Sequence, residues 1–118
     1  MDKVFIDEKS FKSENFGVMV LKFRKALGLT QEDFGKIMML TRRTIIKIEQ
    51  LEDVSELSDD LLFRLNHLSF RLMINEKFDD LVRFRANEVY NATYSILIEK
   101  IIDDNDKSTV KLIKKNIY

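Results

Sequence analysis

The chain contains 118 residues, 20 of them basic and 20 acidic, with three glycines and neither cysteine nor proline. This length permits one ordinary domain at most, or a domain of about 60 residues that would be only marginally stable alone, joined to an extension. The equal charges exclude a whole-molecule attraction to polyanions, so nucleic-acid binding requires a local basic patch. The lack of cysteine excludes disulfides, thiolate metal sites and cysteine nucleophiles.

The amino-terminal segment MDKVFIDEKSF is not typical of a signal peptide, because acidic residues interrupt its apolar run and no small-residue cleavage site follows. No stretch approaches the roughly 18 apolar residues that a membrane span needs. We therefore expect a soluble, cytoplasmic protein with no membrane partner. Abundant Leu, Ile, Lys and Glu without proline predict a mainly helical chain.

The first elements in chain order are an arm over residues 1–12 and a helix after it. Residues 4–6 of the arm are compatible with a short strand. Ser13 is a candidate N-cap, and Gly28 supplies the stop expected just past the end of a helix. Between them apolar residues recur at intervals of three and four, which predicts a buried helix face. The residues of this face are Phe16, Val20, Phe23 and Leu27.

A second helix is predicted from Thr30, whose hydroxyl can accept from the backbone N–H of Asp33 while the Asp33 carboxylate reaches back. Gly35 lies on this helix, where its missing Cβ lets another backbone approach closely. The predicted buried face consists of Phe34, Ile37 and Met38.

A third helix is predicted from Thr41, again as N-cap. At 100° per residue, Ile45 and Ile48 lie on its inner side. The outer side carries Arg43, Ile46, Lys47 and Gln50, with Arg42 at the flank.

The segment LEDVSELSDD is polar enough for a loop, and Ser58 followed by two aspartates predicts another helix start. That helix should continue to about Asn75 through Leu61, Leu62, Leu65, Leu68 and Leu72.

A long amphipathic helix is predicted from about Glu76 to Ile102. Its apolar residues are Phe78, Leu81, Val82, Val89, Tyr90, Tyr94, Leu97, Ile98 and Ile101. At 1.5 Å per residue it would span roughly 40 Å, which is too long for one small core to cover. The apolar stripe that these residues form therefore packs over the first domain or forms a dimer interface, and we favour the interface. The basic segment KSTVKLIKKNIY that ends the chain is compatible with strand or helix.

Two short helices joined by a tight turn, the second with a basic outer side, have the geometry that places a helix in a DNA major groove. The paired arginines of TRRT, Arg42 and Arg43, lie at the start of that second helix. Arginine pairs bidentately with guanine O6 and N7, and Lys47 adds charge for phosphates.

At these residues the chain resembles the Cro/repressor, or Xre-type, helix-turn-helix family of prokaryotic and phage regulators. FRKALGLTQEDFGKIMMLTRRTIIKIEQ, from Phe23 to Gln50, is similar to the family pattern of an arginine, G-L-T-Q-E-E-L-A, a turn, and S-R-S-T-I-S-R-I-E-N-G. The resemblance extends over about residues 16–72. It implies an all-α, lambda-repressor-like helix-turn-helix bundle, here with a long carboxyl-terminal helical extension.

By this resemblance a set of residues on the second and third helices would face double-stranded DNA. They are Gln31, Thr41, Arg42, Arg43, Thr44, Lys47 and Gln50. Gln31 would contact a phosphate and support a neighbouring recognition residue, Thr44 would lie at the boundary with DNA, and Gln50 would contact a phosphate. Arg24 and Glu49 match positions that the family joins by a partly buried ion pair.

The chain departs from the family pattern at two places. Met39 replaces the usual turn glycine, which predicts a different or strained turn, because a bulky residue at positive φ is disfavoured. Gln50 and Leu51 replace asparagine and glycine, so the third helix runs on or exits differently.

The sequence offers no pattern for catalysis, a cofactor or a metal. His67 lies among leucines without ligand-spaced companions, which favours a surface or core-edge position. The pairs at 59–60 and 103–104 are aspartates that a helix start and a helix stop explain. We therefore do not expect an enzyme.

The sequence thus predicts three parts: an arm at 1–12, a helix-turn-helix domain at 13–74, and a dimerisation extension with a basic tail at 75–118. The predicted function is a sequence-specific DNA-binding transcriptional regulator, a repressor, acting as a homodimer through residues 76–102. The alternative is an antitoxin or phage accessory protein that uses the same scaffold to bind a second protein. Met39 and Leu51, which depart from the family pattern, keep this alternative open. The tail lysines either contact phosphates or solvate the segment. They are Lys107, Lys111, Lys114 and Lys115.

Overall fold

The computed structural model describes residues 15–104, and every regular element in that range is helical. The elements are α2 (Phe16–Ala26), α3 (Gln31–Met38), α4 (Arg42–Glu49), a short 3₁₀ helix η1 (Val54–Glu56), α5 (Asp59–Met73) and α6 (Asp80–Asp104). The predicted all-α bundle with a long carboxyl-terminal helix is confirmed. The predictions for the arm at 1–12 and for the basic tail lie outside the described residues.

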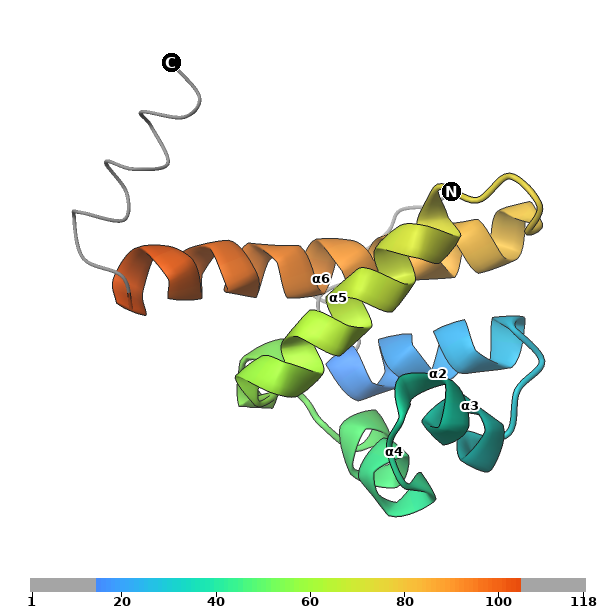
Figure 1. The fold of residues 1–118 in the computed structure, drawn as a ribbon, viewed down its shortest axis with the longest axis horizontal. Helices are drawn as coiled ribbons and strands as arrows, with labels where there is room; N and C mark the ends of the chain where they lie inside the picture. Colours follow the sequence, from blue (N-terminus) through green and yellow to red (C-terminus); the bar gives the residue numbers. More distant parts are fainter. Residues whose placement is uncertain (1–14, 105–118) are drawn as a thin grey trace, which may run out of the picture.

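Helices α2, α3 and α4 form a head at one end of the molecule, and α6 lies across the other end (Figure 1). Helix α5 crosses α6 and connects the head to it. Helix α6 packs against both α5 and α2, so the head and the long helix share one core. No helix of the part that the structure describes is long and apolar enough to cross a membrane.

Serine and threonine N-caps set three of the helix starts, as predicted. The side-chain oxygens of Thr30, Thr41 and Ser58 each accept from the backbone N–H three residues on, over 3.0, 3.2 and 3.3 Å. Each contact satisfies one of the N–H groups that a helix start leaves without a partner.

The predicted N-cap of the first helix, Ser13, is wrong, because α2 begins at Phe16 with Asn15 as N-cap. Asn15 makes no side-chain cap hydrogen bond. The first N–H groups of α2 instead donate to the chain that follows α4: Phe16 N to Glu52 O over 3.2 Å, and Gly17 N to Leu51 O over 2.8 Å. A tertiary contact therefore replaces the local cap.

The core contains most of the apolar residues predicted for the first four helices. Phe16, Val20, Phe23, Phe34, Met38, Ile45, Ile48, Leu62 and Leu65 are all buried. The prediction for Ile37 is wrong: its side chain is 53% exposed and borders a pocket between α3 and α5. Leu57, expected in a loop, is buried because η1 turns the chain inward through a capping box between Asp53 and Glu56.

The long helix begins at Asp80, later than the predicted Glu76, and the Asp79 carboxylate accepts from the N–H of Val82 over 2.9 Å. Its 25 residues span roughly 38 Å at 1.5 Å per residue. The apolar pattern predicted as one stripe divides between two faces. The inner face, packed on α5 and α2, carries Val82, Ala86, Val89, Thr93 and Leu97. The outer face exposes Leu81, Phe84, Tyr94, Ile98 and Ile102.

Polar contacts fix the pairing of α5 with α6. The buried Thr93 hydroxyl accepts from Asn66 Nδ2 over 3.1 Å and lies 2.9 Å from the carbonyl of Val89. Where the start of α5 lies near the end of α6, Lys100 Nζ lies 2.8 Å from Asp59 Oδ1. Because buried polar groups must find partners, the Asn66–Thr93 contact favours a single register between the helices.

Candidate nucleic-acid interface

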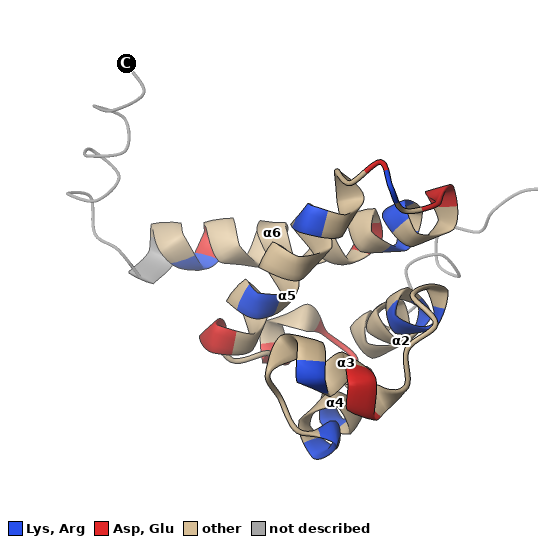
Figure 2. Cartoon of the chain, turned by 45° about the vertical axis from the view of Figure 1, so that its right-hand side comes forward, with Lys and Arg blue, Asp and Glu red and all other residues tan. Residues whose placement is uncertain are grey.

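Helix α4 presents a basic outer side because its inner side is fixed in the core. Ile45 and Ile48 are 0% and 1% exposed, whereas Arg42, Arg43 and Lys47 are exposed. The Lys and Arg positions of α4 lie at the end of the molecule opposite α6 (Figure 2). An exposed cationic helix at the tip of a head can approach a polyanion without obstruction from α6.

The start of α4 is ordered by two threonines. Thr41 Oγ1 accepts from the backbone N–H of Thr44 over 3.2 Å, and the two hydroxyls lie 3.1 Å apart. Thr41 is exposed and Thr44 is half-buried. The positive end of the helix dipole therefore lies beside the two arginines, which favours anion binding there.

A buried ion pair links α2 to α4. Arg24 Nε donates to Glu49 Oε2 over 2.6 Å, and Arg24 Nη2 donates to Glu49 Oε1 over 3.1 Å. Arg24 Nη1 also donates to the carbonyl of Leu29 over 2.9 Å. The two side chains are only 10% and 4% exposed, so this pair, predicted from the family resemblance, belongs to the scaffold.

Gln31 extends this network rather than lying free in front of α4. Its Nε2 donates to Glu49 Oε1 over 3.0 Å, which connects the start of α3 to the end of α4. In the structure its amide therefore supports the ion pair. Its contact with a phosphate stays a prediction.

The turn between α3 and α4 is strained at Met39, as the replacement of glycine predicted. Met39 has φ 59° and ψ 43°, and is the non-glycine residue with positive φ within residues 15–104. Gly35 makes the tight turn possible, because a Cβ there would lie 2.6 Å from the carbonyl oxygen of Leu40. Arg64 Nη1 donates to the carbonyls of Met38 and Met39 over 2.9 and 3.2 Å. Helix α5 thus holds the turn from outside.

The end of α4 also differs from the family pattern. The helix stops at Glu49 and does not run on; Gln50 is the C-cap, with φ −97° and ψ −4°. The chain then leaves beside α2, where Leu51 accepts from Gly17. A Cβ on Gly17 would overlap the carbonyl of Glu49, so the close approach needs glycine.

The seven residues predicted to face DNA all lie on α3, on α4 or at their caps. Gln50 is exposed along with the cationic residues of α4. The positioning roles of Gly17 and Arg64 were missed, because each depends on a contact far along the chain. For Arg64 the only local signal is its position four residues after Asp60, with which it forms an exposed ion pair at 3.2 Å.

Two of the aspartates and the histidine that could serve catalysis or metal binding lie along α5. Asp59 and Asp60 lie in the first turn of α5, and His67 is exposed on the same helix. Within residues 15–104, no group of three or more His, Cys, Asp or Glu side chains is placed to hold a metal ion.

Comparison with known proteins agrees with this geometry. Residues 20–67 match the family model described as helix-turn-helix, from within α2 to within α5. No curated protein and no solved structure matches the chain. The match includes the capped helix α3, the turn and α4, with the ion pair that joins α2 to α4. Residues 20–67 therefore form a helix-turn-helix domain that is similar to those of the Cro/repressor, or Xre-type, family of DNA-binding regulators.

Proposed function

We propose that the protein is a sequence-specific transcriptional repressor that reads the DNA major groove with α4. The observation that carries this proposal is the exposure of Arg42, Arg43 and Lys47 on a helix whose opposite side is buried, within a domain of a DNA-binding family. An α-helix fits the major groove, where each base pair presents a distinct set of donors and acceptors.

Each exposed residue has a role that suits its chemistry. Arg42 and Arg43 read base edges, because a guanidinium can donate two parallel hydrogen bonds to guanine. Lys47 contacts phosphates. The threonines at the start of α4, with Gln31 and Gln50, hold the DNA backbone and so fix the register of α4 on the duplex.

The test is Arg43→Ala on a duplex first selected from genomic fragments by the wild-type protein. If Arg43 pairs bidentately with guanine, specific binding should weaken by about 1 to 3 kcal/mol, and base preference should relax at one position. Fluorescence anisotropy with matched and scrambled duplexes measures both effects.

Lys25→Ala is the matched control, because Lys25 is an exposed cation on α2. It should leave base preference unchanged. Equal losses on matched and scrambled duplexes for Arg43→Ala would remove the base-reading role and leave only a phosphate contact.

We further propose that two copies associate through the outer face of α6. One recognition helix of 8 residues makes few contacts, and helix-turn-helix proteins commonly bind as dimers to half-sites about one DNA turn apart. Among residues 15–104 the inner face of α6 is packed on α5 and α2, whereas its outer face is exposed and can associate.

The outer face of α6 carries the exposed apolar and aromatic side chains that a dimer interface needs. Tyr94 and Ile98 are exposed at its middle, between Phe84 and Ile102. Tyr90 links the face to α5, since its ring lies 5.5 Å from Tyr94 and 5.6 Å from Phe70. Exposed apolar surface that spans two helices is typical of protein association sites. In this proposal residues 75–118 are the dimerisation extension.

A further inference from the structure

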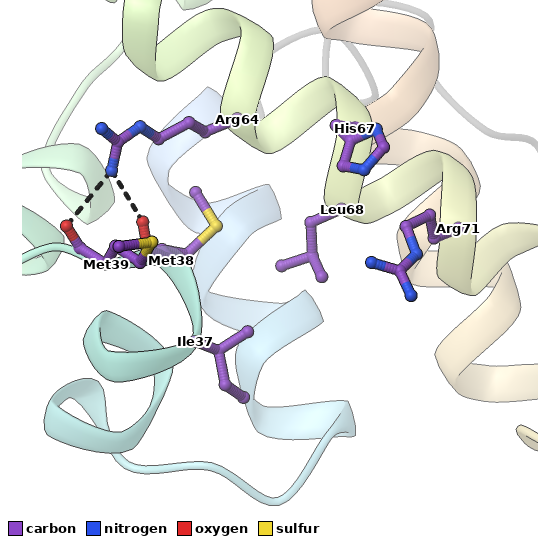
Figure 3. Close-up of a pocket in the computed structure, with 7 residues that line it drawn as sticks. All are labelled: Ile37, Met38, Met39, Arg64, His67, Leu68 and Arg71. Carbon is purple, nitrogen blue, oxygen red and sulfur yellow. Dashed lines mark hydrogen bonds between the residues drawn. The ribbon is translucent and has the colours of Figure 1, made fainter.

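A pocket of about 400 Å³ lies between α3 and α5, beside the turn that leads into α4 (Figure 3). Ile37 and Met38 of α3 and Leu68 of α5 supply apolar surface to it. Ligand pockets of proteins have volumes of roughly 300 to 1,000 Å³ and mostly apolar walls with a few polar groups. The space therefore suits a small organic molecule with an apolar body.

The polar groups that line the pocket are basic or neutral, and none is acidic. They are Arg64, His67 and Arg71, all from α5. Arg64 is already engaged, because it donates to the carbonyls of Met38 and Met39 and pairs with Asp60.

Arg71 and His67 differ from Arg64 in having no hydrogen-bond or ion-pair partner within the part of the chain that the structure describes. Figure 3 shows the guanidinium of Arg71 turned toward the side of the pocket where Leu68 and Ile37 lie. A guanidinium with unused donors beside an apolar wall is suited to an anionic group on an apolar body.

We propose that this pocket binds a small organic anion, a carboxylate or phosphate monoester carried on an apolar ring or chain. The anionic group contacts Arg71 and the imidazole of His67, and the apolar body lies along Ile37 and Leu68. Within residues 15–104 neither Arg71 nor His67 has a partner to leave, so the pocket is complementary to such a ligand in charge as well as in surface.

The position of the pocket connects it to the recognition helix, and this step rests on the proposed DNA-binding function. Met38 and Met39 line the pocket and also form the end of α3 and the turn before α4. A ligand seated there contacts the segment that orients α4, so a ligand that binds one orientation of α4 more tightly than another changes duplex affinity. By linkage, the duplex changes ligand affinity by the same factor. The ligand is then an effector of the regulator.

Calorimetric titration of the full chain without DNA tests the site, with naphthaleneacetate, naphthyl phosphate and the neutral naphthaleneacetamide as probes. We expect at least one anion to bind roughly tenfold or more tightly than the amide, because hydrogen bonds to charged groups are the stronger ones. The two anions distinguish a carboxylate from a phosphate preference. Arg71→Gln should abolish the preference for the anion, whereas Ile37→Ala should weaken anion and amide alike.

Arg85→Gln is the matched control, because Arg85 pairs with Glu88 on α6 and does not line the pocket. It should leave probe binding unchanged. No binding of any probe, or equal binding of anion and amide, overturns the site. If Arg71→Gln instead lowers duplex affinity and its salt dependence while no probe binds, Arg71 is a phosphate contact and the proposal is wrong.

The effector role is tested separately, by measuring duplex affinity with and without a bound probe. A probe that binds the free protein but leaves duplex affinity unchanged overturns that role while the site stands. Failure of the protein to bind any duplex would count against the proposed function alone, because the titration uses no DNA.

Discussion

Glu49 is the residue at which the three helices of the head meet. It accepts two hydrogen bonds from Arg24 and one from Gln31, and its side chain is almost fully buried. A buried carboxylate of this kind is tolerated because its partners replace the water that it has lost. The position of α4 therefore depends on a fully paired charge.

The ion pair predicts non-additive effects of substitution. Arg24→Leu or Glu49→Leu alone should lower the free energy of unfolding by about 3 to 5 kcal/mol, because each leaves a buried charge unpaired. The double variant should lose less than either single variant. Urea denaturation of the four proteins in a double-mutant cycle measures this.

The half-exposed pair Arg85–Glu88 gives the control cycle for the buried pair. Its single substitutions should cost no more than about 1 kcal/mol. A double variant of Arg24 and Glu49 that loses the sum of the two single effects would contradict the account.

Single residues differ in how far the sequence could predict their roles. The pairing of Arg24 with Glu49 follows from the family resemblance, which places both in one motif. Gly17 and Arg64 carry no such signal, because glycine and arginine occur in many helices without special contacts. Their roles appear only when α4 lies against α2 and the turn lies against α5.

At the scale of elements, the turn between α3 and α4 combines a close approach with strain. The left-handed conformation costs an L-residue roughly 1 to 2 kcal/mol, and glycine avoids this cost. Met39 is 83% exposed, so its side chain gains little from packing in return. The turn is thus a place where stability can be raised without altering the core.

Met39→Gly should raise the free energy of unfolding by about 0.5 to 1 kcal/mol, the relief of strain minus the extra flexibility that glycine gives the unfolded chain. Met39→Ala is the matched control, because it also removes the side chain but keeps the Cβ. It should bring no gain. Thermal and urea denaturation measure both variants, and a glycine variant less stable than the alanine variant would contradict the left-handed assignment.

Helix boundaries show why some elements are predictable from sequence. The starts at Thr30, Thr41 and Ser58 depend on hydrogen bonds within three residues, which the sequence displays directly. The start of α2 depends on Glu52 and Leu51, far along the chain, and was therefore predicted too early at Ser13. Local chemistry predicts an element's boundary only where no tertiary partner competes.

At the scale of the whole molecule, α6 has two apolar faces with different roles. Hydrophobic spacing predicted a long helix but could not separate a face packed on the same chain from a face left exposed. The structure buries Val89 and Leu97 and exposes Tyr94 and Ile98. Covering both faces requires the rest of the chain on one side and, in our proposal, a second copy on the other.

The proposed dimer predicts that the wild-type protein sediments at twice the 14.0 kDa mass of the chain. Tyr94→Arg with Ile98→Arg should convert it to a folded monomer, because charges buried at an interface without partners oppose association. Glu32→Arg changes the charge by the same amount at an exposed position on α3, away from α6, and should stay dimeric. Sedimentation velocity with circular dichroism measures both properties, and a monomeric wild-type protein at high concentration would contradict the dimer.

The central claim is that α4 is the part of the molecule that binds DNA. Its most direct test is the salt dependence of duplex affinity for the wild-type protein and for the variant with Arg42, Arg43 and Lys47 all replaced by alanine. We predict that wild-type affinity falls steeply with salt, and that the variant binds weakly, with a slope reduced by about one for each phosphate that the replaced side chains neutralise. Absence of duplex affinity at low salt with micromolar wild-type protein, or an unchanged slope and affinity in the variant, would contradict the account.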